Sequence, residues 1–121
     1  MNYAESLQYI LSFTNLAFMR HIPYSERTWN LDRIEALMDA LEHPERAFPA
    51  VHIAGTKGKG STCAFVESIL RAHGFRTGMF TSPHLVSPCE RFRIDSRPVD
   101  EALFVRHIHE TYALLEAKRV G

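Results

Sequence analysis

The segment Gly55–Ser61 carries the residues of this chain that are best suited to phosphate chemistry, with three glycines, two lysines and two hydroxyls. Glycines let the backbone turn tightly, so that several N–H groups can converge on the oxygens of one phosphate. Lys59 can neutralise phosphate charge, and the hydroxyl of Ser61 can bind phosphate or its metal ion. The segment therefore predicts a phosphate-binding loop at the start of a helix.

The match to the common phosphate-loop pattern is imperfect. Gly60 follows Lys59, so the hydroxyl of Ser61 comes one residue late, and the first glycine of the pattern would fall at Ile53. A dinucleotide-binding fingerprint is excluded because it would need a glycine at Cys63. The alternative is a glycine-rich turn without a ligand. The order of strand, loop, lysine, hydroxyl and helix favours the phosphate site.

The elements around this loop must bring it into position. Residues 50–54 form a short apolar run that predicts a buried strand, and a helix with Gly74 as its C-terminal cap is expected after the loop. Residues 76–81 predict the next strand, which would pair in parallel through a right-handed crossover. The expected fold class is α/β, a mostly parallel sheet flanked by helices. Gly55 and Ser82 would then meet at the carboxyl ends of the strands.

The remaining segments contain three predicted helices and one predicted short strand, with loops over 14–28 and 82–88. Apolar periodicity indicates one helix over 3–13, a second from an Asn30 cap to about Glu42, and a last one capped by Asp100. Alternating side chains predict a short strand over 91–95.

Composition limits the classes of function. The chain has 121 residues, 45% of them hydrophobic and 23% charged, which is typical of one small globular domain. Fourteen basic and fourteen acidic residues give a net charge of zero, so we expect neither nucleic acid nor membrane as a partner. No run of about 18 apolar residues and no basic leader is present, and a cytoplasmic location is expected. Cys63 and Cys89 form no C-x-x-C pair, which argues against a zinc cluster.

The chain carries three motifs, at His52–Thr62, Thr81–Leu85 and Glu90–Ile94. At this spacing they resemble the folylpolyglutamate synthase / dihydrofolate synthase family of Mur-type amide ligases, and the resemblance covers nearly the whole chain. Lys57 stands where bacterial members often have Asn, and Phe92 replaces a more usual Ile. The resemblance implies a monomeric, Mg²⁺-dependent ligase. Such an enzyme uses ATP to add L-glutamate to dihydropteroate or to a folate glutamate tail, through an acyl phosphate.

The resemblance also implies roles for the matching positions. The ATP phosphates would be held by Gly55, Thr56, Lys57, Gly58, Lys59, Gly60 and Ser61, with Lys59 as the catalytic residue. Ser82 and Ser61 would bind Mg²⁺, and such neutral hydroxyls need carboxylate or phosphate partners to hold this cation. The folate or dihydropteroate substrate would contact Thr28, Trp29, Asn30, Pro83 and His84.

Several of these positions have simpler explanations that the sequence leaves open. Ser82 is also a turn residue before a proline, and His84 is equally explained as a solvated loop residue. Trp29 can be a packing aromatic, and Asn30 is already explained as a helix cap. The arginines at 91 and 93 fit the solvated face of a strand better than contacts to an anionic substrate.

The family enzymes are several times longer, so the resemblance implies that this chain is the N-terminal portion of an ATP-binding domain and is inactive alone. A metal-binding Glu, a further metal-binding His, a modified Lys and a second domain would come from downstream. Four parts are expected along the chain. They are a helical segment over 1–48, a strand–loop–helix–strand unit over 49–81, a substrate and metal loop with a short strand over 82–95, and a helix over 98–119. The alternative function is a phosphate-loop nucleotide-binding module without ligase activity. A third and simpler interpretation is a structural βαβ domain with a tight turn.

Overall fold

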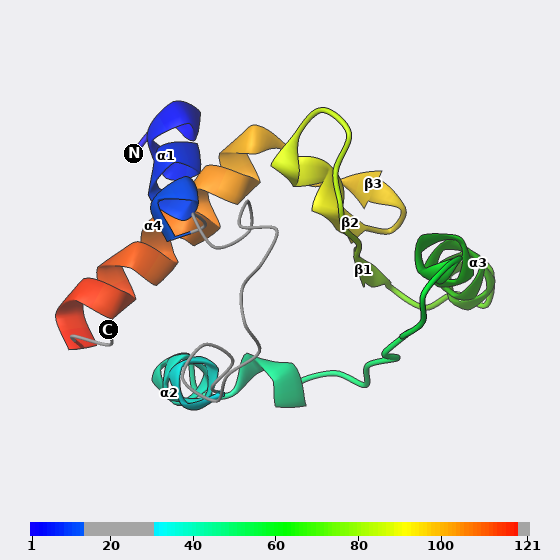
Figure 1. Ribbon diagram of the computed structural model, residues 1–121. Coiled ribbons are helices and arrows are strands. Elements are labelled where there is room, and N and C mark those ends of the chain that lie inside the picture. The colour runs from blue at the N-terminus through cyan, green and yellow to red at the C-terminus, as the bar shows by residue number, and fades with distance from the viewer. Residues whose placement is uncertain (14–30, 119–121) are drawn as a thin grey trace. The chain divides into compact units, whose positions relative to one another are not determined.

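The computed structural model of the chain describes residues 1–13 and 31–118 (Figure 1). Two compact units make up the chain, Met1–Pro49 with Val105–Gly121 and Ala50–Phe104. None of the described helices is both long and apolar enough to cross a membrane. The described elements are, in order, α1 (Tyr3–Phe13), α2 (Asp32–Ala40), the 3₁₀-helix η2 (Pro44–Arg46), α3 (Lys59–Ala72), β1 (Gly78–Phe80), the 3₁₀-helix η3 (Pro88–Arg91), β2 (Phe92–Ile94), β3 (Arg97–Pro98) and α4 (Glu101–Lys118).

The sheet of the unit Ala50–Phe104 is small and antiparallel, which corrects the predicted parallel sheet. It has three strands in the order β1-β2-β3, with Met79 opposite Arg93 and Arg93 opposite Pro98. Residues 50–54, predicted as a strand, belong to no strand, so the predicted parallel crossover unit is wrong. Parallel sheets need helices on both faces. Among the described residues of this unit, the helical cover is α3, η3 and the first turn of α4. The mixed α/β class is confirmed.

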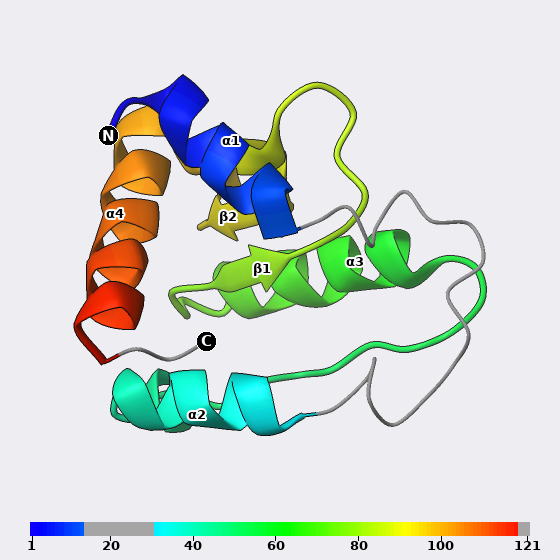
Figure 2. The ribbon, with the colours of Figure 1, turned by 60° about the vertical axis from the view of Figure 1, so that its left-hand side comes forward.

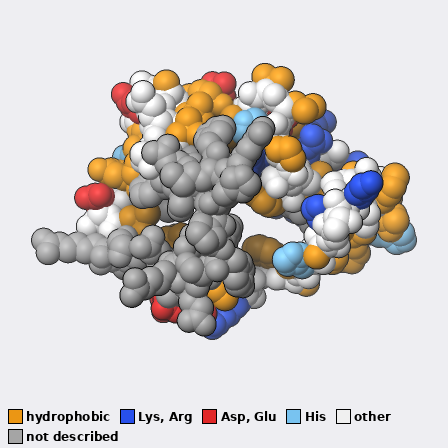
Figure 3. All heavy atoms as spheres, in the orientation of Figure 1, with side chains coloured by type: hydrophobic (Ala, Val, Ile, Leu, Met, Phe, Trp, Pro, Cys, Tyr) orange, Lys and Arg blue, Asp and Glu red, His pale blue; other side chains and the backbone are white. Residues whose placement is uncertain are grey.

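The same difference leaves apolar side chains of α3 exposed. Hydrophobic side chains gather on the surface over this helix (Figure 3), where Phe65 is 69% and Ile69 59% exposed. The helix that the sequence predicted after the loop is confirmed as α3. The sheet expected to cover that face is not formed by the described residues.

The end of α3 follows its capping signal. Gly74 has φ of 88°, a left-handed conformation that glycine adopts at low cost. Its N–H donates to the Arg71 carbonyl at 3.0 Å, and the Phe75 N–H donates to the Leu70 carbonyl at 3.2 Å. These two bonds form a Schellman motif. The prediction of Gly74 as the cap is confirmed.

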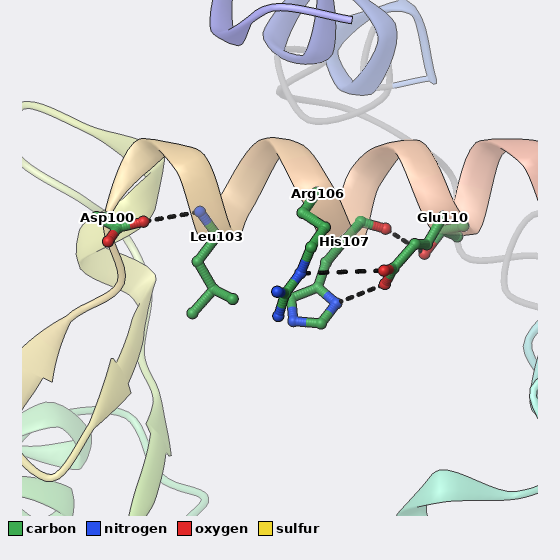
Figure 4. Close-up of polar contacts among 6 residues, drawn as sticks. Asp100, Leu103, Arg106, His107 and Glu110 are labelled. Atoms are coloured by element: carbon green, nitrogen blue, oxygen red, sulfur yellow. Dashed lines mark hydrogen bonds and ion pairs between the residues drawn. The ribbon is translucent and has the colours of Figure 1, made fainter.

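The start of α4 also follows its capping signal. The Leu103 N–H donates to Asp100 Oδ1 at 2.7 Å, which confirms Asp100 as the cap (Figure 4). Further along, Glu110 accepts from His107 Nδ1 at 3.0 Å and lies 3.9 Å from Arg106 Nε (Figure 4). Such exposed pairs each add less than about 1 kcal/mol, so the position of α4 depends on its apolar face.

The apolar core of the unit Ala50–Phe104 centres on one residue of that face. Phe104 is 5% exposed, and its ring centroid lies 6.2 Å from that of Phe92 on β2. Phe92 in turn lies 5.2 Å from Phe80 on β1. Phe80 and Phe92 remain partly exposed, so Phe104 is the buried member of this row of three aromatic rings.

In the other unit, α1 begins with a capping box that the sequence analysis missed. The Glu5 N–H donates to Asn2 Oδ1 at 2.9 Å, and the Asn2 N–H donates to Glu5 Oε2 at 2.8 Å. The rings of Tyr9 on α1 and Tyr112 on α4 meet edge to face, with centroids 4.9 Å apart. The predicted helix over 3–13 is confirmed with the same bounds.

The helix α2 is confirmed and is slightly shorter than predicted. Its N-cap is Leu31, whose side chain makes no capping bond, while the predicted cap Asn30 lies outside the described residues. Glu42 and His43 have φ of 61° and 56°, so the helical path has ended before Pro44.

A buried polar cluster joins α3 to the start of β1. Glu67 is 7% exposed, and its Oε1 accepts from Thr77 Oγ1 at 2.7 Å and from Arg71 Nε at 3.1 Å. The Thr77 N–H donates to Asp95 Oδ1 at 2.9 Å, and the Asp95 N–H donates to the Thr77 carbonyl at 2.9 Å. The cluster therefore ties α3 to the start of β1 and to the residue that follows β2.

Glu67→Ala is expected to destabilise the chain by about 2 kcal/mol, because the buried Thr77 hydroxyl loses its acceptor. Urea unfolding followed by far-ultraviolet circular dichroism measures the change. Glu110→Ala, which removes an exposed carboxylate, should stay within about 0.5 kcal/mol of the wild type. Equal unfolding midpoints for the two variants would contradict a structural role for the cluster.

Candidate functional site

The predicted phosphate loop leads directly into α3. Gly58 is the N-cap of this helix and has φ of 75°, which favours glycine at this position. The backbone bond from the Thr62 N–H to the Gly58 carbonyl, at 2.9 Å, closes the first helical turn. The N–H groups before it have no carbonyl within the helix to bind. The first turn contains no acidic residue, so the positive end of the helix dipole is available to an anion.

Lys59 spans the loop. Its ammonium Nζ donates to the Gly55 carbonyl at 2.8 Å, which links the first residue of the loop to the first residue of α3. The side chains of Lys57, Lys59 and Ser61 are exposed. A cation and a row of backbone donors thus lie at the same helix end, accessible to a ligand.

The segment Ser82–Ser87 leaves the carboxyl end of β1. The loop is closed at its base, because the Thr81 N–H donates to the Arg91 carbonyl at 3.0 Å. Ser82 is exposed and precedes Pro83 through a cis peptide bond, and His84 is half-buried. Arg91 Nε donates to His84 Nδ1 at 2.8 Å.

The phosphate loop and this segment lie at the same end of the α3–β1 pair. α3 and β1 run in opposite directions, so the N-terminus of the helix and the carboxyl end of the strand face the same way (Figure 2). Ser61 on α3 and Ser82 after β1 belong to these two ends. The predicted contacts Thr28, Trp29 and Asn30 lie outside the described residues.

Glu90 is a residue of this region that the sequence analysis missed. Its carboxylate accepts the N–H groups of Ser87 at 2.8 Å, Val86 at 2.9 Å and Leu85 at 3.1 Å. Ser87 and Glu90 also form a capping box at the start of η3. The S-x-x-E spacing of such a box is visible in the sequence and could have identified Glu90.

The arginines next to Glu90 have polar partners other than its carboxylate. Arg91 binds His84, and Arg93 Nε donates to the Glu90 carbonyl at 3.4 Å. Both are half-buried. The predicted solvated face of this strand is therefore only partly solvated, and one of its arginines orients a residue of the predicted substrate loop.

The hydrogen bonds to Glu90 make its environment dependent on pH. The N–H groups of Ser87, Leu85 and Val86 stabilise the carboxylate and lower the pKa of Glu90 below its ordinary value of 4.5. The stabilisation is complete above the unfolded-state pKa and is lost as the pH falls through the lower folded-state pKa. We expect the amide NMR signals of residues 85–87 to shift in that acidic range. Glu90→Gln should give a flat profile, and a wild-type transition with its midpoint above pH 4.5 would contradict the assignment.

The residues predicted to bind Mg²⁺ at this end, Ser61 and Ser82, offer hydroxyl groups. Within residues 1–13 and 31–118, no group of three or more His, Cys, Asp or Glu side chains could hold a metal ion. The exposed hydroxyls of Ser61 and Ser82 fit Mg²⁺ only together with phosphate oxygens, because this cation prefers charged oxygen ligands. They suit a metal ion that arrives with a nucleotide.

Comparison with known proteins finds a consistent set of relatives, although no family model matches the chain. A folylpolyglutamate synthase of Arabidopsis thaliana is 48% identical over 96 residues, which are 75% of this chain and 15% of the relative. The dihydrofolate synthase/folylpolyglutamate synthase of Mycobacterium tuberculosis is 47% identical over 90 residues, 72% of this chain and 18% of the relative. A mitochondrial folylpolyglutamate synthase of Bos taurus is 56% identical over 66 residues, 54% of this chain and 11% of the relative. The chain spans less than a fifth of the length of these relatives.

Solved structures agree with these matches. A folylpolyglutamate synthase complex with AMPPCP and folate has a TM-score of 0.82 at 33% identity, and covers 98% of this chain and 27% of that protein. The synthetase of Lactobacillus casei has a TM-score of 0.80 at 31% identity, with 98% and 28% covered. The Mycobacterium tuberculosis enzyme complexed with ADP and AMPPCP has a TM-score of 0.66 at 46% identity, with 74% and 21% covered.

Proposed function

This chain is a homologue of one segment of the folylpolyglutamate synthase / dihydrofolate synthase family, and we propose that it carries the phosphate-binding part of an ATP-dependent ligase. The observation that carries the proposal is the match of 98% of the chain to a relative bound to AMPPCP and folate. The proposed enzyme adds L-glutamate to dihydropteroate, to a tetrahydrofolate glutamate tail, or to both.

The proposed reaction has two steps. The γ-phosphoryl group of ATP moves to the substrate carboxylate, which gives an acyl phosphate and ADP. The amine of L-glutamate then attacks the acyl carbon, forms the amide bond and releases phosphate and a proton. Negative charge on the transferring phosphoryl oxygens must be stabilised in the first step, and fixed N–H donors and a lysine are suited to this.

The loop Gly55–Ser61 is proposed to bind the ATP phosphates. The N–H groups at the start of α3 would donate to phosphate oxygens, and Lys59 would exchange the Gly55 carbonyl for a phosphate oxygen. When bound, Mg²⁺ would neutralise phosphate charge. Ser61 and Ser82 are the residues of this chain proposed to hold it, because both hydroxyls are exposed at the same end of the α3–β1 pair.

The segment Ser82–Ser87 is proposed to border the folate or dihydropteroate substrate. Pro83 and His84 are the proposed contacts from this segment, and Thr28, Trp29 and Asn30 are the proposed contacts from the N-terminal part. Support for the segment comes from its place after the carboxyl end of β1, at the same end of the α3–β1 pair as the proposed phosphate site (Figure 2). The groups that complete the site would come from the much longer part of the family enzymes that this chain does not span.

ADP release by the full-length protein that contains this chain tests the proposal. The assay contains Mg-ATP and L-glutamate and offers dihydropteroate and tetrahydrofolate in separate reactions. Release with dihydropteroate alone indicates a dihydrofolate synthase, release with tetrahydrofolate alone a polyglutamate synthase, and release with both a bifunctional enzyme. ATP binding without release in either reaction would contradict the ligase and favour a nucleotide-binding module.

A further inference from the structure

The carboxylate of Glu90 accepts several backbone hydrogen bonds from the segment Ser82–Ser87. Three consecutive N–H groups converge on it, with Oε1 accepting from Val86 and Ser87 and Oε2 from Leu85. Hydrogen bonds to an ionised acceptor are about twice as strong as neutral ones. The backbone at the tip of the loop is therefore tied to one side chain of η3.

Side-chain packing does not hold this tip in place. Leu85 is 93% exposed and Val86 is 89% exposed, so neither side chain is buried against the rest of the unit. Conformational entropy favours disorder in an exposed loop unless specific contacts oppose it. Here the contacts that oppose it are the hydrogen bonds to Glu90.

Arg91 fixes the ring of His84 next to the tip. Because the guanidinium Nε can only donate, the Nδ1 atom of His84 must accept the 2.8 Å bond and carries no proton. The proton of the neutral ring is then on Nε2, which becomes a hydrogen-bond donor. Arg91 thus selects the tautomer of a residue that the proposed function places at the substrate.

Glu90 and Arg91 lie in η3, which is attached to the sheet. η3 runs directly into β2, where Phe92 pairs with Phe80 of β1. The carbonyl of Arg91 also accepts from the Thr81 N–H at the other end of the loop. Both ends of the segment are therefore anchored to the sheet.

From these contacts we propose that Glu90 and Arg91 are positioning residues that hold the segment Ser82–Ser87 ready for the pteridine part of the substrate. The inference rests on the proposed function of that segment. Glu90 fixes the backbone, and Arg91 presents the Nε2–H of His84 to an acceptor atom of the substrate. Because the loop is ordered in advance, the substrate does not bear the entropy cost of ordering it.

Hydrogen exchange tests the hold of Glu90 without any assay of activity. In the ligand-free full-length protein, Glu90→Gln removes the negative charge and replaces one carboxylate oxygen by an amide NH2 group, which cannot accept a hydrogen bond from the backbone N–H groups. We expect the amides of residues 85–87 to exchange about tenfold faster or more, since that is the change for each 1.4 kcal/mol lost. Glu101→Gln, the same change at an exposed position of α4, should exchange like the wild type in this segment. Unchanged exchange in Glu90→Gln would overturn the proposal.

Steady-state kinetics test whether the ordered segment Ser82–Ser87 contributes to binding of the pteridine substrate. We expect Glu90→Gln to raise the KM of the pteridine substrate about tenfold while the KM of ATP stays within twofold of that of the wild type and of Glu101→Gln. Faster exchange without a change in the pteridine KM would overturn the positioning role. A parallel loss for ATP and pteridine, with lower thermal stability, would also overturn it, because that pattern indicates general damage to the fold.

Failure of the proposed ligase function can be distinguished from failure of the positioning role. Wild-type protein that releases no ADP with either pteridine contradicts the function and, with it, the role toward the substrate. The exchange experiment then still decides, by itself, whether Glu90 holds the loop.

Nitrogen-15 NMR of the ligand-free protein tests Arg91. The wild type should show His84 with a protonated Nε2 and a bare Nδ1, and Arg91→Gln should show a mixture of tautomers. The matched variant Arg76→Gln, at an exposed position, should retain the wild-type signal. A protonated Nδ1 in the wild type would overturn the assignment.

Discussion

Lys59→Ala in the full-length protein is expected to lower kcat/KM for ATP by about 100-fold or more. The ammonium of Lys59 is the cation that α3 places at the end of the glycine loop, where it already binds the Gly55 carbonyl at 2.8 Å. Its removal takes away a charge that would stabilise the transferring phosphoryl oxygens, and it also opens the contact across the loop. ADP release at varied ATP concentration measures the effect.

The control for this variant is Arg106→Ala. It removes the same charge from an exposed site on α4, where the ion pair with Glu110 has atoms 3.9 Å apart. We expect ADP release to be unchanged there. Equilibrium binding of Mg-ATP to Lys59→Ala provides the second readout. Unchanged binding would contradict both the ligase and the nucleotide-binding module, and would leave the loop as a structural turn.

Phe104→Ala is expected to destabilise the chain by about 3 kcal/mol or more, because it empties the most buried aromatic position of the unit Ala50–Phe104. The ring is 5% exposed and contacts Phe92 on β2. Removing the ring exposes the side of the small sheet on which it packs, and this sheet supports η3 and the loop before it. Urea unfolding followed by far-ultraviolet circular dichroism measures the loss of stability.

Phe65→Ala is the matched control, since it deletes an identical ring from an exposed position. Phe65 is 69% exposed on α3, so its removal should cost less than about 1 kcal/mol. If the two variants lose similar stability, Phe104 is not the centre of this core.

Local signals allowed the helices to be predicted well. Gly74 and Asp100 were identified as caps because their roles depend on the residue itself and on its immediate neighbours. The same physics explains the two capping boxes that were missed, Asn2–Glu5 and Ser87–Glu90, which have the three-residue spacing of that motif. A search for this spacing would have shown Glu90 as more than a surface charge.

The sheet could not be predicted in the same way. An apolar run such as 50–54 has the composition of a buried strand, but a strand forms only when another segment supplies the partner edge. β1 pairs with β2 through the register Met79–Arg93, and 50–54 pairs with no described residue. Composition indicates that a segment suits a sheet, and it does not indicate which edge accepts it or in which direction.

By itself, the sequence determined the four α-helices among the described residues, the glycine loop that precedes α3, and the family that the motifs resemble. These features depend on local spacing and on residue types. Only the tertiary structure decided that the sheet is antiparallel and that Glu90 gathers three amides. It alone also showed that Arg91 sets the ring of His84. The strand pairing joins segments that are distant in the chain, and no local pattern specifies which edges meet. The capping-box spacing points to Glu90, but it does not specify the further bonds from Leu85 and Val86 or the bond between Arg91 and His84.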